Sequence, residues 1–348
     1  MNNDIFDKRT VIFTRCPVGS GTEVLLRKGL LEKAYNKAGA RIVLLQSLPS
    51  PELVKHLTQE APLAFRDGGN VPPIWSHSRG TRTRVIGITA IKQSHAILTA
   101  PDSPIQSPED LRGKRLAVPL ALNSVVDPMR AMVTRGYQTV LDAYKIGKEE
   151  VTFVDVAVPR HIPAKGGTEN SDPAFLPPHT EEIRALQSGE VDAFFSHRSL
   201  VAQIEERGLA RVIIDISKTP LSNVNNIYPS IITVHEDFAA ENRDLVLIYL
   251  EELLKAAEWA KEHQEESLEF GAAGQHGATR EQLRKTRAPD AYKYYAPGFD
   301  PPLVDLLASQ KEFLLKNHFI EKDFDLEEWL DRSFLREAQE QFREHAVA

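Results

Sequence analysis

Apolar and polar residues follow two different periods along the first part of the chain. Short apolar runs at residues 10–15 and 41–45 each predict a strand. Between them, apolar side chains recur at the spacing of one amphipathic helix: Val24, Leu25, Leu30, Leu31 and Tyr35. A short helix is expected near residues 51–58, after the second strand.

The ends of the first helix carry recognisable signals. Ser20 is followed three residues later by Glu23, which is the spacing of a capping box. Gly39 offers a stop at the other end. The first strand is therefore expected to lead through residues 16–20 into a helix N-terminus.

Strand and helix patterns continue to alternate further along the chain. Apolar runs at residues 84–89, 95–99 and 115–118 are bounded by turn residues and predict further strands. Such alternation is typical of an α/β protein with a largely parallel sheet. From about residue 236 the pattern is helical, with amphipathic segments at 237–265, 279–286, 302–317 and 325–343.

Length and charge narrow the class of protein. A chain of 348 residues suits two lobes, or one large α/β unit with a helical addition. A net charge of -7 argues against binding to nucleic acid or an acidic membrane, because no basic excess offsets phosphate charge. No apolar run reaches the roughly 18 residues that span a bilayer, and no signal peptide precedes the first strand. We therefore expect a soluble, cytoplasmic protein.

The single cysteine, Cys16, is the first candidate for chemistry. It lies where the first strand is expected to run into a helix, beside Arg15. The positive end of a helix dipole and a neighbouring cation both favour a thiolate. A lone cysteine is also commonly a small buried apolar residue, and position alone leaves both readings open.

Arg66 is the second candidate, because it enters a predicted turn at Gly68 and Gly69. Unhindered glycine amides and a guanidinium fork together suit a small oxyanion. His56 and His77 flank this turn, and their spacing does not choose between them. A thiol, an imidazole and an anion clamp are the parts of an activated nucleophile or acid site. The 11 histidines show no metal-ligand spacing, so no metal site is expected.

Two phrases carry a resemblance to a known fold. Residues 107–118 read SPEDLRGKRLAV and residues 185–194 read ALQSGEVDAF. They resemble signatures of periplasmic binding proteins of the sulfonate, taurine and pyrimidine-precursor branch. The resemblance implies an α/β, bilobed, type II periplasmic-binding-protein-like fold, with two mixed, mostly parallel sheets, flanking helices and a C-terminal helical region. Residues 1–95 with 222–348 would form lobe I, and residues 96–221 an inserted lobe II.

At the candidate residues the chain also resembles the 2'-hydroxybiphenyl-2-sulfinate desulfinase family. The family's Cys-Pro-Val matches residues 16–18, its His lies ten residues before its Arg, as His56 does before Arg66, and its Arg-x-Gly-Gly-x-x-Pro-Pro matches residues 66–73. The match favours His56 over His77. Between this His and the following Pro, the family's aromatic residue and glutamine are replaced by Gln59 and Ala61, which puts the biphenyl substrate in doubt more than the reaction class.

The resemblance implies a role for each matched residue. Cys16 would be the essential thiol, as a proton donor or as a nucleophile, and His56 would orient it. Arg66 and the amide of Gly69, next to Gly68, would hold the sulfinate oxygens. The implied reaction is hydrolysis of a carbon–sulfur bond in a small organic sulfinate with release of sulfite, without a metal or organic cofactor.

Lobe II is expected to complete the cleft. Ser196 and His197 follow the strand around residues 191–193 and are candidate substrate contacts, although an ordinary strand end is an equal reading. Residues 158–179 contain several prolines and a Gly-Gly pair, and they predict a long loop that is either a functional lid or a linker. We expect a monomer.

Two other functions remain open from the sequence. A non-catalytic receptor for sulfonates or similar organic anions, serving an ABC importer, would use the Arg66 and Gly69 clamp but would need no thiol. A pyrimidine-precursor synthase would depend on iron and a Cys-rich segment, and one cysteine counts against it.

Overall fold

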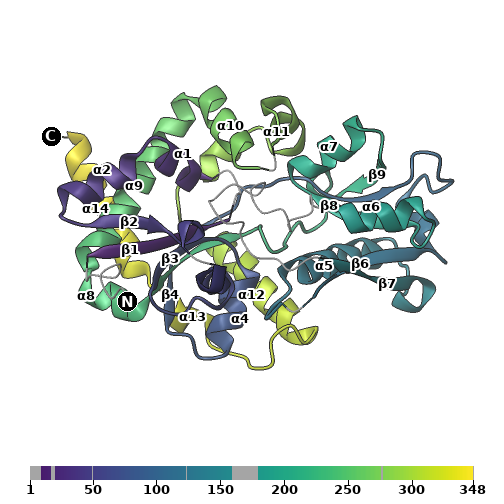
Figure 1. The fold of residues 1–348 in the computed structure, drawn as a ribbon, viewed down its shortest axis with the longest axis horizontal. Helices are drawn as coiled ribbons and strands as arrows, with labels where there is room; N and C mark the ends of the chain where they lie inside the picture. The colour runs from purple at the N-terminus through teal and green to yellow at the C-terminus, as the bar shows by residue number, and fades with distance from the viewer. Residues whose placement is uncertain are drawn as a thin grey trace.

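The computed structural model describes residues 9–16, 20–48, 50–122, 124–158, 179–275 and 277–347. Within these residues the chain builds two five-stranded sheets, which lie at opposite sides of the molecule in Figure 1. Both sheets are mixed, as the resemblance to binding proteins implies, and each combines parallel and antiparallel pairs.

The first sheet has the order β2-β1-β3-β10-β4. Its strands are β1 (Thr10–Arg15), β2 (Arg41–Leu44), β3 (Leu63–Gly69), β4 (Thr83–Thr89) and β10 (Ser230–His235). β1 runs parallel to β2 and β3, whereas β10 is antiparallel to β3 and β4. The central strand β3 is buried along its whole length, and its Ala64 and Phe65 belong to an apolar core shared with helices.

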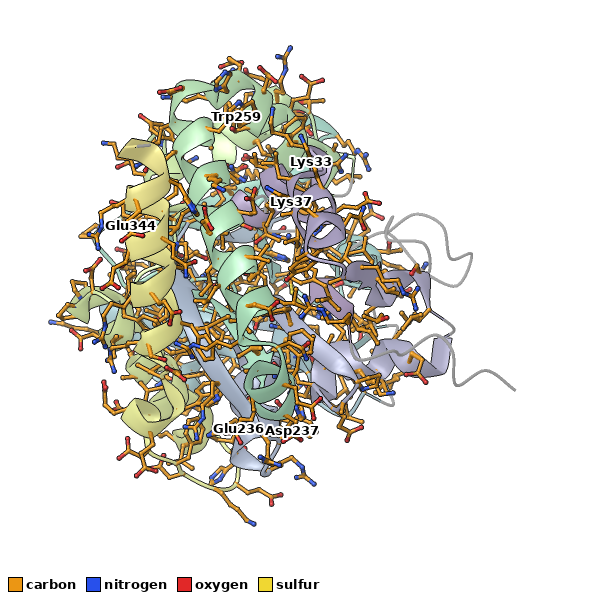
Figure 2. The ribbon with its side chains drawn as sticks, turned by 90° about the vertical axis from the view of Figure 1, so that its left-hand side faces the viewer. Lys33, Lys37, Glu236, Asp237, Trp259 and Glu344 are labelled. Atoms are coloured by element: carbon orange, nitrogen blue, oxygen red, sulfur yellow. The ribbon has the colours of Figure 1, made fainter. Side chains whose placement is uncertain are left out.

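Helices from both ends of the chain cover this sheet. One face packs against α1 (Gly21–Arg27), α2 (Leu30–Lys37), α9 (Arg243–Glu262) and α14 (Arg332–Val347), which share one apolar core. Figure 2 looks onto this side, where α14 runs alongside α9 and the labelled Lys33, Lys37 and Glu344 lie at the surface. The other face packs against α4 (Val71–Ser78), α12 (Pro301–Lys316) and α13 (Leu326–Trp329).

The second sheet has the order β7-β6-β8-β5-β9. Its strands are β5 (His95–Thr99), β6 (Arg115–Ala121), β7 (Thr152–Val158), β8 (Ala193–His197) and β9 (Arg211–Asp215). Helix α5 (Pro128–Ala143) covers one face, and α6 (Thr180–Gln187) with α7 (Ser199–Glu206) covers the other. Phe194 and Phe195 are successive residues of β8, so their side chains point to opposite faces of the sheet and enter two separate cores.

The remaining helices connect these layers. They are α3 (Lys55–Thr58), α8 (Glu236–Glu241), α10 (Gln264–Ala273) and α11 (Arg280–Thr286). Among the described residues no helix combines the length and the apolar character needed to cross a membrane.

Most strands expected from the sequence are confirmed. The structure also agrees with both segments that resemble binding-protein signatures, residues 107–118 and 185–194. The carboxylate of Asp110 accepts a hydrogen bond from the Ser107 backbone N–H at 3.0 Å, so this turn is capped ahead of β6. Helix α6 ends before Gly189, which adopts a left-handed φ of 73°, and the buried β8 follows.

Three local predictions were wrong. The first helix is broken into α1 and α2 at Gly29, whose φ is 64°. The Ser20–Glu23 capping box is absent, because Glu23 forms ion pairs with Arg15 and Arg27 instead. Two of the C-terminal amphipathic segments are interrupted: 237–265 breaks between α8 and α9, and 325–343 breaks between α13 and α14, whereas the segments at 279–286 and 302–317 are confirmed as α11 and α12.

The predicted Gly-Gly turn is a further correction, and it bears on the site. Arg66, Gly68 and Gly69 are residues of β3, and the chain turns only at Asn70 before α4 begins. The sequence lacks the apolar alternation of a strand here because the second half of β3 consists of Arg66, Asp67 and two glycines. The loop expected at residues 158–179 lies almost wholly outside the described residues.

Candidate active site

The site begins where β1 ends. Cys16 follows β1 directly and is half-buried. The parallel pairing of β1 with β3 sets Arg15 opposite Asp67, and the Cys16 N–H donates to the Asp67 carbonyl at 2.8 Å. The thiol is therefore held beside the last residues of β3.

Gly68 allows this close approach. A Cβ at position 68 would lie 2.5 Å from Cys16 Sγ, and the backbone there has a φ of 150°. Both the space and the conformation thus require glycine. Gly69 is crowded too, because a Cβ there would lie 2.7 Å from the Asn226 amide.

His56 comes from α3, a short helix after β2. Its Nε2 lies 3.5 Å from Cys16 Sγ, and its Nδ1 lies 2.8 Å from Thr14 Oγ1. The imidazole therefore bridges the side chains of Thr14 and Cys16, which lie two residues apart at the end of β1. His77 is excluded as this partner, since its ring is stacked on Trp329 with centroids 4.7 Å apart.

Arg66 closes the arrangement from β3. Its guanidinium donates through Nη2 to Cys16 Sγ at 3.5 Å, through Nε to the His56 carbonyl at 2.9 Å and through Nη1 to the Gly69 carbonyl at 2.7 Å. These three hydrogen bonds fix the orientation of the guanidinium, so this side chain is preorganised.

Burial shapes the charges around the thiol. Desolvation lowers the pKa of Arg66 from its usual value, while Cys16 and Asp67 oppose this change. Burial likewise raises the pKa of Asp67, which hydroxyl hydrogen bonds and the two arginines Arg66 and Arg15 oppose. Each group in this cluster is thus held against a desolvation cost by its partners.

The cation that contacts Cys16 Sγ is Arg66 and not the expected Arg15. Arg15 turns to Glu23, with 2.9 Å between Nη1 and Oε2, and it is Arg66 that donates to Cys16. Residues 17–19, which include the rest of the Cys-Pro-Val motif, lie outside the described residues.

Ser196 and His197 lie on the other sheet, in β8. Both are buried, and the His197 ring packs 5.7 Å from that of His179. Opposite His197 in the register stands His95, on β5. The structure thus brings Cys16, His56, Arg66, Gly68 and Gly69 together and places Ser196 and His197 in the second half of the molecule.

Two supporting residues were missed from the sequence: Thr14 contacts His56, and Gln46 contacts Thr14. Gln59, which the sequence marks as a departure from the desulfinase family, bonds Ser76 and Thr233 after α3. Thr14 was accessible to reasoning, because residues two apart on a strand share a face and Cys16 marks that face. Gln46 carries no local signal, since its role depends on a tertiary contact.

The comparisons with known proteins identify the family of this chain and several similar proteins. Residues 35–267 match a family model described as NMT1/THI5 like. The chain belongs to this NMT1/THI5-like family. A curated relative from Rhodococcus erythropolis, named 2'-hydroxybiphenyl-2-sulfinate desulfinase, is 24% identical over 94% of this chain and 92% of its own length. The predicted resemblance to the desulfinases is thereby confirmed.

Other similar proteins are named as sulfonate-binding proteins. A Bacillus subtilis relative named as a putative aliphatic sulfonates-binding protein is 23% identical over 90% of this chain and 83% of its own. Among solved structures, a cysteine-to-serine mutant of DSZB in complex with biphenyl-2-sulfinic acid has a TM-score of 0.78 at 23% identity, covering 96% of this chain and 100% of its own. The aliphatic sulphonate binding protein SsuA from Escherichia coli has a TM-score of 0.63 at 17% identity, covering 93% and 92%. These structures share the fold of this NMT1/THI5-like chain.

The contact between Gly68 and Cys16 gives a stability prediction. Gly68→Ala forces Cβ into the thiol, so the free energy of unfolding should fall by about 1–3 kcal/mol more than in Gly80→Ala. Gly80 is a matched control, because its φ of 97° is also left-handed but nothing lies within 4 Å of a Cβ there. Equal losses in the two variants, measured by urea denaturation, would show that the thiol does not occupy this space.

His95 gives a prediction on pH. Desolvation lowers the pKa of His95 from 6.5 to about 3, so the folded state keeps it neutral while the unfolded chain takes up a proton below pH 6.5. The free energy of unfolding should therefore decrease as the pH is lowered below 6.5. Between pH 6.5 and 5 the wild type should lose roughly 1.5 kcal/mol more than His95→Asn.

A surface histidine provides the control for this measurement. His318 is exposed and has a φ of 59°, which asparagine tolerates, so His318→Asn is the matched histidine-to-asparagine substitution outside the core. A His95→Asn variant with the wild-type dependence would mean that His95 is protonated in the folded protein.

Proposed function

We propose that this protein is a desulfinase that hydrolyses the carbon–sulfur bond of an organic, aromatic sulfinate. The balanced reaction is R–SO2⁻ + H2O → R–H + HSO3⁻. The observation that carries the proposal is one sulfur atom contacted by two nitrogen atoms: Cys16 Sγ lies 3.5 Å from His56 Nε2 and 3.5 Å from Arg66 Nη2. The curated relatives named as desulfinases support the same reaction.

Arg66 is the proposed anion clamp. A sulfinate is negative when it binds and sulfite is negative when it leaves, so the site must stabilise negative charge throughout. The guanidinium is buried and preorganised, and such a group in a water-poor site stabilises an anion more strongly than it would in water. The amide of Gly69, beside it, is the proposed second donor to the sulfinate oxygens.

Cys16 is the proposed reactive group, with His56 as its orienting partner. It acts on the carbon–sulfur bond either by giving a proton to the ring carbon or by attacking sulfur. Cys16 is the single thiol of the chain, and an imidazole and a guanidinium contact it. Such surroundings are typical of reactive rather than structural cysteines.

The second half of the molecule is proposed to close over the substrate. We assign residues 1–95 with 222–348 to lobe I and residues 96–221 to lobe II, with Ser196 and His197 facing the substrate from lobe II. The two sheets support this division, because β1 to β4 and β10 fall in the first part and nearly all of β5 to β9 in the second. A monomeric state and a cytoplasmic location stay predictions.

A receptor for organic anions is the alternative, and the relatives named as sulfonate-binding proteins favour it. Such a receptor would use Arg66 in the same way but would have no reaction for Cys16 to perform. The two functions therefore differ in whether the thiol is needed for anything beyond binding.

The deciding prediction concerns Cys16→Ser. Sulfite release from an aryl sulfinate should fall to the background rate, while the affinity for the same sulfinate, measured by calorimetry, should stay within about tenfold of wild type, or ~1.4 kcal/mol. The substitution is nearly isosteric, and circular dichroism confirms folding. A wild-type protein that binds aryl and alkyl sulfinates but releases no sulfite would establish the receptor instead.

A further inference from the structure

We propose that Gln46 and Thr14 fix the tautomer of His56, so that its neutral ring carries a proton on Nε2 and donates a hydrogen bond to Cys16 Sγ. The inference deepens the proposed function and rests on it for its catalytic meaning. It makes Gln46 and Thr14 positioning residues, which act on the thiol through the imidazole.

The chain of hydrogen bonds starts at Gln46, a buried residue in the 3-10 helix after β2 (Leu45–Ser47). Its side-chain Nε2 lies 3.0 Å from Thr14 Oγ1 and 3.4 Å from the carbonyl oxygen of Arg15. A carbonyl can only accept, so the NH2 group of the amide must face this side. Gln46 therefore donates to the hydroxyl of Thr14.

Thr14 transmits the direction of that hydrogen bond. Its side chain is fully buried, and its hydroxyl has one proton to give. Among the described residues two side chains contact the hydroxyl: Gln46 is a donor, and the other contact is His56 Nδ1 at 2.8 Å. The hydroxyl proton therefore goes to Nδ1, which must accept with its lone pair.

His56 then has its proton on the other nitrogen. With Nδ1 as acceptor, the neutral ring is protonated at Nε2, which lies 3.5 Å from Cys16 Sγ. Arg66 also donates to this sulfur. Under this proposal Sγ receives hydrogen bonds from two nitrogens, one of His56 and one of Arg66.

The direction of the hydrogen bonds defines what His56 does. Its neutral ring has no lone pair facing Cys16, so it does not act as the base that removes the thiol proton. It holds the sulfur as a hydrogen-bond donor. If Cys16 loses its thiol proton before the reaction, His56 Nε2 is not the group that accepts this proton.

Nitrogen NMR of the substrate-free protein labelled with 15N-histidine tests the tautomer directly. The His56 signals, assigned by their loss in His56→Asn, should show a protonated Nε2 and an unprotonated Nδ1 once the pH is high enough for the ring to be neutral. The opposite tautomer in the wild type would overturn the proposal.

Variants of the two positioning residues test how the tautomer is fixed. Gln46→Glu replaces the donor with an acceptor, so the Thr14 hydroxyl should turn towards Glu and accept from a protonated Nδ1, which reverses the tautomer. Thr14→Val removes the hydroxyl and should abolish the preference, whereas Thr14→Ser should retain it. An unchanged Nε2–H tautomer in either Gln46→Glu or Thr14→Val would overturn the proposal.

Kinetics on an aryl sulfinate complete the test. Gln46→Glu and Thr14→Val should lower kcat by about tenfold or more with little change in KM, and Thr14→Ser should recover most of the loss. Because the NMR experiment needs no substrate, the two hypotheses fail separately. An Nε2–H tautomer with no sulfite release would support the hydrogen-bond chain and reject the desulfinase function.

Discussion

The parallel pairing of β1 with β3 is the constraint on which the site depends. It places the end of β1, with Thr14 and Cys16, against the end of β3, with Arg66 and Gly68. Strand pairing fixes side-chain positions more rigidly than a loop would, because each residue is held by a ladder of hydrogen bonds. The thiol and the guanidinium therefore come from adjacent positions of one sheet although they are 50 residues apart in sequence.

The site uses buried polar groups that stabilise one another. Arg66 lies in the sheet centre with its donors directed at backbone carbonyls and at sulfur, and Asp67 follows it with hydroxyls around its carboxylate. Burying these groups opposes folding unless each finds a partner. A fold that retains them in its central strand keeps a fixed cation next to its only thiol, which suits the binding and cleavage of a small anion.

The sequence predicted the fold well where residue patterns are local. β1, β4, β5 and the turn at residues 107–110 follow from apolar runs and capping residues, and the resemblance to binding proteins supplied the two mixed sheets. β3 was missed because Arg66, Asp67 and two glycines replace the apolar pattern of a buried strand. The long helix expected before residue 39 is two helices, since Gly29 in its middle was not weighed as a break.

The candidate site was predictable in part. Cys16, His56 and Arg66 were found from residue type and from the desulfinase resemblance, whereas residue spacing alone left His77 open. The role of Arg15 was misjudged, because its pairing with Glu23 depends on how α1 packs beside β1. Gln46 could not be found from the sequence, since only the parallel β1–β2 pair brings it to Thr14.

A crystal structure of the Cys16→Ser protein with a bound aryl sulfinate tests the central claim most directly. The account predicts sulfinate oxygens within hydrogen-bond distance of the Arg66 guanidinium and sulfinate sulfur next to the side chain of residue 16. A sulfinate bound elsewhere in the molecule, with Arg66 still holding only its backbone carbonyls, would contradict it.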